Sequence, residues 1–332
     1  MNKKRLVYWV SIGVVLVGLL AYVAVTVDFS ILQRVAPGSV APLVLLAVVV
    51  SVLDVLQIWV LLWGMGHQVS VFWLAMATIS TLWLSFMTPT KVGIPVRVYL
   101  FRKMFGVPVG HGTAAVLVGA VLSLLVSGVA ALIGVLIVFD ATWLRVPLAA
   151  FMGVLLLGIS ALFVFSKPLD RWGRTRRLHP KIRGVVTVGL DLLAGLRTIS
   201  PLAVTIYLVL AVPRLIVPAL NLQVILSTLG VELPLGHLVI LRAVSRVMGF
   251  VSMMPMGLGA QEATLVALLN LLGSPSDVTA LAAVMDRFVN TGIVLILGVI
   301  ATSVMGPRLV HMGADEGDIM YRSDTESAEG VS

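Results

Sequence analysis

Long runs of apolar residues with almost no charge are the feature that most constrains this chain. A helix needs about 20 mostly apolar residues to cross the hydrocarbon core of a bilayer, and six stretches reach that length, at 6–27, 42–63, 112–139, 146–165, 201–228 and 278–304. Only 11% of the 332 residues are charged, whereas a soluble domain carries about 25%. The sequence therefore predicts an all-α polytopic integral membrane protein with six full spans, and it excludes cytosolic enzymes and soluble binding modules.

The positions of Lys and Arg predict the orientation of these spans. The loop 166–184 holds seven Lys and Arg residues, and Lys3, Lys4 and Arg5 precede the first span. Because loops rich in Lys and Arg stay in the cytoplasm, we predict a cytoplasmic N-terminus and a location in the cytoplasmic (inner) cell membrane. The first apolar stretch is longer than the 7 to 15 residues or so of a cleavable signal, so we interpret it as a retained span.

Two further apolar segments, 69–105 and 236–272, are interrupted by Pro, Gly and charge. An even number of crossings must lie between the two cytoplasmic regions, and the four unbroken spans of that interval already satisfy this condition. We therefore predict that 69–105 is a re-entrant or broken-helix hairpin that opens to the cytoplasm. The same argument makes 236–272 a hairpin that enters from the other side. Full crossings, which would give about eight segments, remain the alternative.

The two broken segments also resemble each other in the order of their helix-breaking residues, which predicts an inverted repeat of the kind found in transporters. Backbone groups freed by Pro or Gly must pack in protein or line a wet cavity, so we expect these positions to border a cavity. The alternative is that Pro and Gly are simply frequent in membrane helices. The hairpin positions are Pro89, Gly93 and Pro95 in the first segment, and Pro255, Gly257 and Gly259 in the second.

Ionisable side chains inside the apolar segments indicate a polar path, because each costs at least about 2.5 to 3.5 kcal/mol at mid-bilayer unless hydrated or paired. Arg242 and Arg246 are four residues apart, hence on one helical face, and Arg suits bidentate capture of phosphate. We predict headgroup-binding residues at Lys91, Arg97, Arg242 and Arg246, and residues for charge balance or proton coupling at Glu262, Asp286, Arg287 and Asp54.

Two of these residues have alternative interpretations. Arg97 is alternatively an interfacial anchor that reaches the cytoplasmic headgroups, and Asp54 is alternatively a polar contact between spans.

We expect residues 185–200 to form an amphipathic helix on the cytoplasmic surface. The segment 307–332 is acidic and poor in aromatic residues, which predicts a disordered cytoplasmic tail after a transmembrane domain of residues 1–306.

Motifs of known enzymes were sought in the sequence. It contains no Gly-x-Ser-x-Gly elbow, no Gly-x-x-x-x-Gly-Lys-Ser/Thr loop and no His-Glu-x-x-His motif, and no two histidines have metal-ligand spacing. We therefore expect neither an enzyme nor a metal or other cofactor. The net charge of +8 is interpreted as cytoplasmic loop charge and contact with anionic lipid, so we expect no nucleic-acid partner.

The motifs of the two broken segments resemble a known family. Residues 88–100 with the following 106–108, and residues 255–263 with the following 272–275, resemble the transmembrane region of lysylphosphatidylglycerol synthases. This region is the flippase-like domain of the multiple peptide resistance factor, and it also occurs as a stand-alone protein. The resemblance covers most of residues 1–306, and its matched positions are Gly93, Arg97, Gly259 and Glu262.

The resemblance implies a protein that moves a lipid between leaflets. The chain departs from the family pattern at Ile94, where members often carry an acidic residue, and at Gln261, where an Arg is usual. Both departures remove charges that help to choose a headgroup. A soluble aminoacyl-transfer domain does not follow residue 306, so we expect a chain that is not itself the synthase.

Three classes of function remain at this stage. The first is translocation of an anionic phospholipid, an aminoacylated phospholipid or a lipid-linked intermediate, with membrane lipids as partners and a separate lipid-synthesising enzyme as a further candidate partner. The second is a membrane-embedded transferase that modifies lipids. The third is a membrane scaffold without transport.

Overall fold

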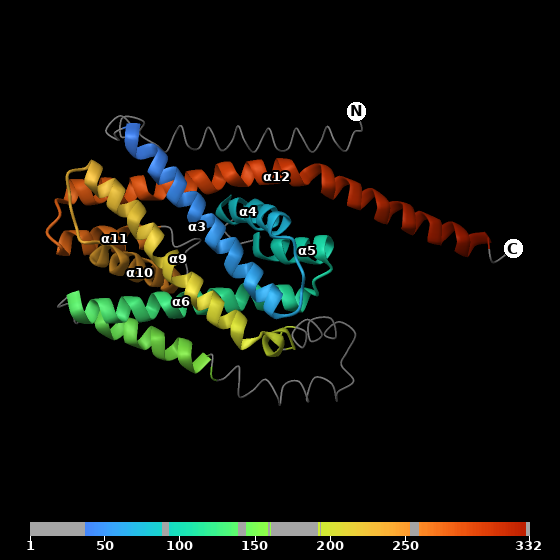
Figure 1. Cartoon of the computed structure of the whole chain (residues 1–332), viewed down its shortest axis with the longest axis horizontal. Coiled ribbons are helices and arrows are strands. Elements are labelled where there is room, and N and C mark those ends of the chain that lie inside the picture. Colours follow the sequence, from blue (N-terminus) through green and yellow to red (C-terminus); the bar gives the residue numbers. More distant parts are fainter. Residues whose placement is uncertain are drawn as a thin grey trace.

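The computed structural model describes residues 37–87, 93–138, 144–158, 194–252 and 259–329, together with residues 160 and 192. Among these residues the secondary structure is helical and no strand occurs (Figure 1). The labelled helices are α3 (Pro37–Gly64), α4 (Val71–Met87), α5 (Gly93–Phe105), α6 (Val109–Val138), α9 (Pro201–Thr228), α10 (Leu235–Val251), α11 (Ala260–Leu271) and α12 (Ser276–Glu329).

Four helices of the described chain are long and apolar enough to cross a bilayer, at Gly38–Gly64, Val109–Val138, Pro201–Thr228 and Ser276–Gly306. Their lengths of 27 to 31 residues correspond to about 40 to 46 Å of helix, more than the hydrocarbon core of about 30 Å. Large apolar side chains such as Leu45, Ile137 and Val209 are exposed on them, as expected for surfaces that face lipid. These helices confirm an all-α, multi-pass membrane protein.

Of the other two predicted spans, one is described in part and one lies wholly outside the described residues. The stretch 6–27 lies outside the described residues. The stretch 146–165 is represented by a shorter apolar helix, Leu144–Gly158. The basic loop 166–184 also lies outside the described residues, and the predicted surface helix 185–200 is helical at residues 192 and 194–198.

Each broken segment consists of two short helices. α4 and α5 have 17 and 13 residues, and α10 and α11 have 17 and 12. At about 18 to 26 Å each, these helices are shorter than the hydrocarbon core. α4 packs on α5, and α10 packs on α11. The two pairs lie towards opposite ends of the long helices (Figure 1).

The predicted hairpin positions fall at the breaks between these short helices. Gly93 begins α5 and Gly259 directly precedes α11. Pro95 lies in the first turn of α5, where the missing N–H of proline is no loss because the first N–H groups of a helix have no intrahelical partner. Residues 88–92 and 253–258, which contain Pro89, Lys91, Pro255 and Gly257, lie outside the described residues.

The packing of the helices repeats between the two halves of the chain. If α3, α4, α5 and α6 are matched in order with α9, α10, α11 and α12, each principal helix–helix contact has a counterpart. α4 packs against α12 of the other half just as α10 packs against α6, and the matched helices α3 and α9 pack against each other. A contact pattern that is unchanged when the halves are exchanged is expected for a repeat related by a pseudo-two-fold axis.

The turns that end α3 and α9 repeat in the same register. Gly66 and Gly230 have positive φ angles of 85° and 76°, which glycine adopts without steric cost. In the residues that follow, the N–H of His67 donates to the carbonyl of Leu62, and the N–H of Val231 donates to that of Leu226. Each pair of equivalent residues is 164 positions apart (66 to 230, 67 to 231). The same spacing relates the ends of α4 to the ends of α10.

Contacts between the halves require close approach at one glycine in particular. A Cβ added at Gly134 of α6 would lie 2.3 Å from Cγ1 and 2.9 Å from Cβ of Ile240 on α10. Ile240 packs against the apolar cluster that joins α6, α9, α10, α11 and α12. The absence of a side chain at residue 134 therefore sets the distance between α6 and α10.

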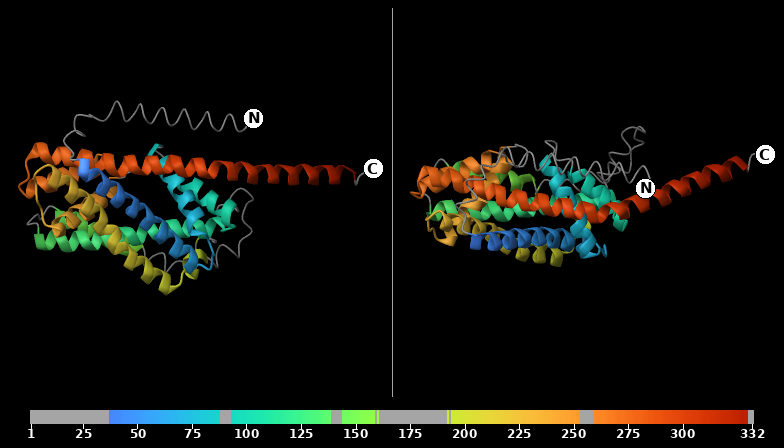
Figure 2. Two further views of the ribbon diagram at one scale, coloured as in Figure 1. Left: turned by 45° about the horizontal axis from the view of Figure 1, so that its top comes forward. Right: turned by 90° about the horizontal axis from the view of Figure 1, so that it is seen from above.

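α12 continues as a helix to Glu329, which differs from the disordered tail predicted for 307–332. The final part of α12 projects away from the other helices (Figures 1 and 2). Its polar composition explains why no core covers it. The helix can continue because each residue added to an existing helix avoids the cost of nucleating a new one. Composition alone does not report this effect.

Candidate functional site

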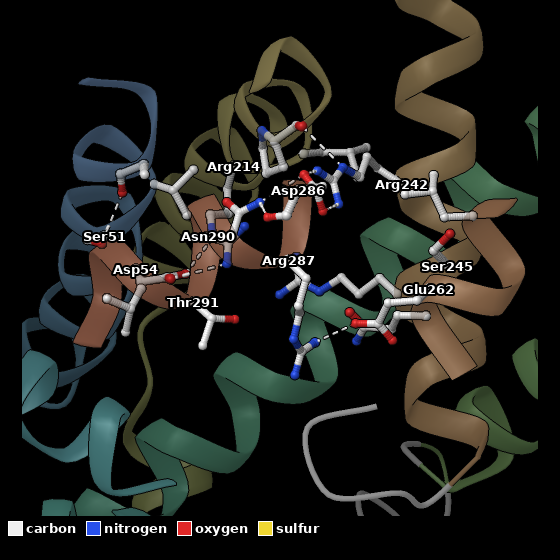
Figure 3. Close-up of a pocket in the computed structure, with 18 of the residues that line it drawn as sticks. Ser51, Asp54, Arg214, Arg242, Ser245, Glu262, Asp286, Arg287, Asn290 and Thr291 are labelled. Atoms are coloured by element: carbon white, nitrogen blue, oxygen red, sulfur yellow. Dashed lines mark hydrogen bonds and ion pairs between the residues drawn. The ribbon is translucent and has the colours of Figure 1, made fainter. Parts of the chain in front are cut away.

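A polar cavity of about 340 Å³ lies between the two halves (Figure 3). α3, α9, α10, α11 and α12 contribute most of its wall, and α4 contributes Leu82. Asp54 and Arg214 stand near the middle of α3 and α9, so the cavity lies at the depth of the candidate membrane spans. Its polar lining residues are Ser51, Asp54, Arg214, Arg242, Ser245, Arg246, Gln261, Glu262, Asp286, Arg287, Asn290 and Thr291.

Two bidentate ion pairs join helices across this cavity (Figure 3). Arg214 donates from Nε to Oδ1 of Asp54 at 2.5 Å and from Nη2 to Oδ2 at 3.1 Å. Arg242 donates from Nη1 to Oδ2 of Asp286 at 2.6 Å and from Nη2 to Oδ1, and its Nε donates to the carbonyl oxygen of Pro218 at 3.1 Å. Pairing lowers the cost of charge at membrane depth. These two pairs therefore connect α9 to α3 and α10 to α12.

A third ion pair lies where α11 begins. Nη1 of Arg287 is 3.0 Å from Oε1 of Glu262, and the N–H of Gly259 donates to Oε2 of Glu262 at 2.8 Å. A glutamate in the first helical turn that accepts from the cap N–H satisfies a donor that the helix itself cannot. Glu262 thus stabilises the start of α11 and also neutralises Arg287.

Arg246 is the fourth arginine of the cavity wall, and it differs from the other three. It forms no ion pair or hydrogen bond with another described residue. The hydroxyl of the adjacent Ser245 is buried and also has no hydrogen-bond partner among the described residues. Four arginines and three carboxylates line the cavity, so its described wall carries one net positive charge.

The structure brings together six of the predicted site residues and separates one. Arg242 and Arg246 line the cavity, as do the four residues assigned to charge balance, Asp54, Glu262, Asp286 and Arg287. Arg97 does not line it. Its side chain is 8% exposed on α5, and Nε donates to Oγ1 of Thr81 on α4 at 2.9 Å. Arg97 therefore connects the two helices of the first pair, whereas Lys91 lies outside the described residues.

Six polar residues of the cavity are not among the predicted site residues, namely Ser51, Arg214, Ser245, Gln261, Asn290 and Thr291. Arg214 had a usable signal, because it is a charge in the middle of an apolar span. Ser245 and Asn290 had none, because uncharged polar residues are common in membrane helices. Asn290 donates from Nδ2 to Oδ1 of Asp286 at 2.9 Å and so supports one of the ion pairs.

A pair of histidines lies apart from the cavity. Nε2 of His67, after α3, is 2.9 Å from Nδ1 of His111 in the first turn of α6. Burial, and then the nearby His111, lower the pKa of His67 below its ordinary value. Within the described part of the chain, no group of three His, Asp or Glu side chains is arranged to hold a metal ion.

The fold and the cavity define a class of protein, namely a polytopic α-helical membrane protein built from two similar halves around a charged cavity. The family model described as the lysylphosphatidylglycerol synthase TM region matches residues 8–298. The chain belongs to this family, which confirms the resemblance seen in its two motifs. No curated protein matches the chain. Membership implies a membrane protein connected to lipid handling.

Proposed function

We propose that this protein moves an anionic lipid headgroup across the cytoplasmic membrane through the cavity, while the acyl chains stay in the surrounding lipid. The observation that carries the proposal is a cavity of about 340 Å³ with four arginines and three acids on its wall, formed between helices that are long enough to span. Charges at membrane depth are costly and mark the paths of polar substrates. The family's connection to lipid handling supports a lipid as the substrate.

The same proposal assigns the two short-helix pairs as opposed re-entrant hairpins within six spans, with a cytoplasmic N-terminus. Their short lengths, their positions at opposite ends of the long helices and the repeated packing support this assignment. In inverted-repeat transporters the substrate site lies at the interface of the repeats, near the midplane. The cavity lies at such an interface, and rocking of the halves would expose it to either leaflet in turn.

Reconstitution into liposomes tests the proposal. The purified chain is inserted into vesicles of phosphatidylethanolamine and phosphatidylglycerol that carry fluorescent phosphatidylglycerol, and a membrane-impermeant reductant then bleaches the outer leaflet. We expect the protein to make the inner-leaflet label accessible, whereas protein-free vesicles keep about half of their signal.

Mass spectra of the same vesicles distinguish the rival classes. A new lipid species would identify a membrane-embedded transferase. Unchanged lipids together with unchanged leaflet exchange would leave a scaffold as the better interpretation. Exchange without a new lipid species is the result that the proposed function requires.

A further inference from the structure

The carboxylates of the cavity have no unoccupied oxygen. Both oxygens of Asp54 accept from Arg214, and both oxygens of Asp286 accept from Arg242. The two oxygens of Glu262 are taken by an arginine and by a backbone N–H. An ammonium group that entered the cavity would therefore have to share these oxygens with donors already in place, beside arginines that repel its charge.

Two neighbouring donor groups of the cavity wall have no partner among the described residues. The guanidinium of Arg246 has five N–H donors and no acceptor, and no described residue accepts from it. Ser245, which is 5% exposed, places a hydroxyl without a partner beside it on α10. Donors left unsatisfied in a buried setting are costly. A ligand rich in acceptors, such as the phosphate of a phosphodiester, would satisfy both side chains.

The net charge of the cavity points to the same ligand. Its described wall carries one positive charge in excess, from Arg246. In surroundings of low dielectric constant an unbalanced charge is strongly unfavourable. A headgroup with one net negative charge neutralises the cavity, a zwitterionic headgroup leaves the excess in place, and a headgroup with a net positive charge doubles it.

We infer that the cavity takes a phosphodiester headgroup with a single net negative charge, of the phosphatidylglycerol type, that Arg246 binds its phosphate, and that a lysyl-esterified headgroup is rejected. This inference rests on the proposed function, because it names the lipid that the cavity accepts. Arg214, Arg242 and Arg287 serve instead to hold the wall together, since the charge of each is already balanced by a carboxylate.

Binding of short-chain lipids to the detergent-purified full chain tests the inference without any need for transport. The titrants are dihexanoyl lipids with the phosphatidylglycerol, phosphatidylethanolamine and lysylphosphatidylglycerol headgroups, followed by calorimetry. We expect phosphatidylglycerol to bind at least about tenfold more tightly than the other two, because it alone balances the charge. Free glycerophosphoglycerol is a fourth titrant. It supports the phosphodiester chemistry if it binds selectively, and its affinity relative to the lipid shows whether the ligand is the lipid or the soluble headgroup.

Variants of Arg246 test the assigned residue. We expect Arg246→Gln to weaken phosphatidylglycerol binding at least about tenfold, since a charge-assisted contact is lost, and to remove the preference for the anion. Arg246→Lys should keep that preference. The control is Arg102→Gln, which removes an exposed arginine at the end of α5 and should bind like the unaltered chain. Size-exclusion profiles establish that each variant is folded.

Equal binding of phosphatidylglycerol and lysylphosphatidylglycerol would overturn the inference, as would unaltered binding by Arg246→Gln. These results are distinguishable from failure of the proposed function. Selective binding without leaflet exchange would contradict translocation alone, whereas leaflet exchange without headgroup selectivity would contradict only the inference.

Discussion

The two halves of the molecule share a backbone plan but differ in charge where they meet the cavity. At the spacing of 164 residues that relates their turns, Arg214 of α9 corresponds to Val50 of α3, and Arg246 of α10 corresponds to Leu82 of α4. All four of these residues line the cavity. Asp54 is the single charged lining residue from the first half within the described structure. The repeat therefore places the cavity between matched helices, and most of its charged lining residues come from the second half.

The largest effect is expected when the side of the membrane on which each short-helix pair begins and ends is measured, because each cysteine is labelled either from one side or from the other. Cysteines placed at Ser70 and Phe105 flank α4 and α5, and cysteines placed at Glu232 and Ser276 flank α10 and α11. The chain has no other cysteine. In oriented vesicles, an impermeant maleimide should label the first two from the cytoplasmic side and the second two from the opposite side. Labelling of Ser70→Cys and Phe105→Cys from different sides would make the segment 69–105 a single full crossing.

Breaking an ion pair of the charged half should have the next largest effect. Asp286→Asn leaves Arg242 without its carboxylate, and removal of one partner of a buried pair costs about 3 to 5 kcal/mol. The carbonyl of Pro108 accepts a backbone hydrogen bond at the start of α6, and the carbonyl of Pro275 accepts the equivalent bond at the start of α12. These two prolines are 167 residues apart, so the position in α6 that matches Asp286 is Gly119. A Cβ at Gly119 would meet neighbours at ordinary distances of 3.6 Å or more, so Gly119→Ala should change the free energy of unfolding by less than about 1 kcal/mol.

Denaturant unfolding in detergent micelles measures both variants. The double variant Arg242→Met with Asp286→Leu should recover most of the lost stability, since an apolar pair can replace a buried ion pair. If Asp286→Asn were as stable as the unaltered chain, the ion pair would have no part in holding α10 to α12.

Close packing between the halves should show a smaller effect. Gly134→Ala forces a Cβ against Ile240, and overpacking of this kind costs about 1 to 3 kcal/mol. The matched residue of α12, at the spacing of 167, is already an alanine, Ala301, which is 1% exposed. Gly153→Ala is the control, because nothing lies within 4 Å of its added Cβ. The midpoint temperature of thermal unfolding should be lower for Gly134→Ala than for Gly153→Ala. Equal midpoints would show that α6 and α10 can move apart freely.

The smallest effect is expected at the matched turns after α3 and α9, where His67 corresponds to Val231. Because the folded chain lowers the pKa of His67, the unfolded chain takes up a proton first as the pH falls below about 6.5. Stability should therefore fall slightly below that pH and level off below the lowered pKa. His67→Gln should flatten this part of the unfolding profile, whereas Val231→Gln should leave its slope in place. If the stability of His67→Gln changed with pH as steeply as that of the unaltered chain, another group would be responsible for the pH dependence.

Much of the fold could be predicted from the sequence, because hydrocarbon allows few alternatives. Apolar runs longer than a bilayer predict spans such as α3 and α9, and the interruptions near Gly93 and Gly259 predict the short helices, because Pro and Gly leave backbone groups that a continuous span cannot satisfy. The helical continuation after residue 306 was not predicted, because composition reports a missing core and not the conformation of the backbone.

The candidate site was predictable only in part. Asp54 and Asp286 were identifiable because a carboxylate inside an apolar span is energetically costly and therefore indicates a pairing or functional role. Their partners were not, since Asp286 and Arg242 are 44 residues apart and stand on α12 and α10, which the tertiary fold brings to the same cavity. Arg97 looked equivalent to Arg246 in the sequence. Only the tertiary structure shows that Arg97 donates to Thr81 and does not line the cavity.

The difference between Arg246 and Leu82 is the most direct point at which to test the account. The measurement is the rate of leaflet exchange of fluorescent phosphatidylglycerol in liposomes, compared between Arg246→Gln and Leu82→Gln, which place the same side chain at matched positions of the cavity wall. We predict that Arg246→Gln lowers the rate at least about tenfold, because the unpaired charge is lost, and that Leu82→Gln lowers it by no more than about twofold. Equal rates for the two variants would contradict the assignment of the headgroup site to the charged half.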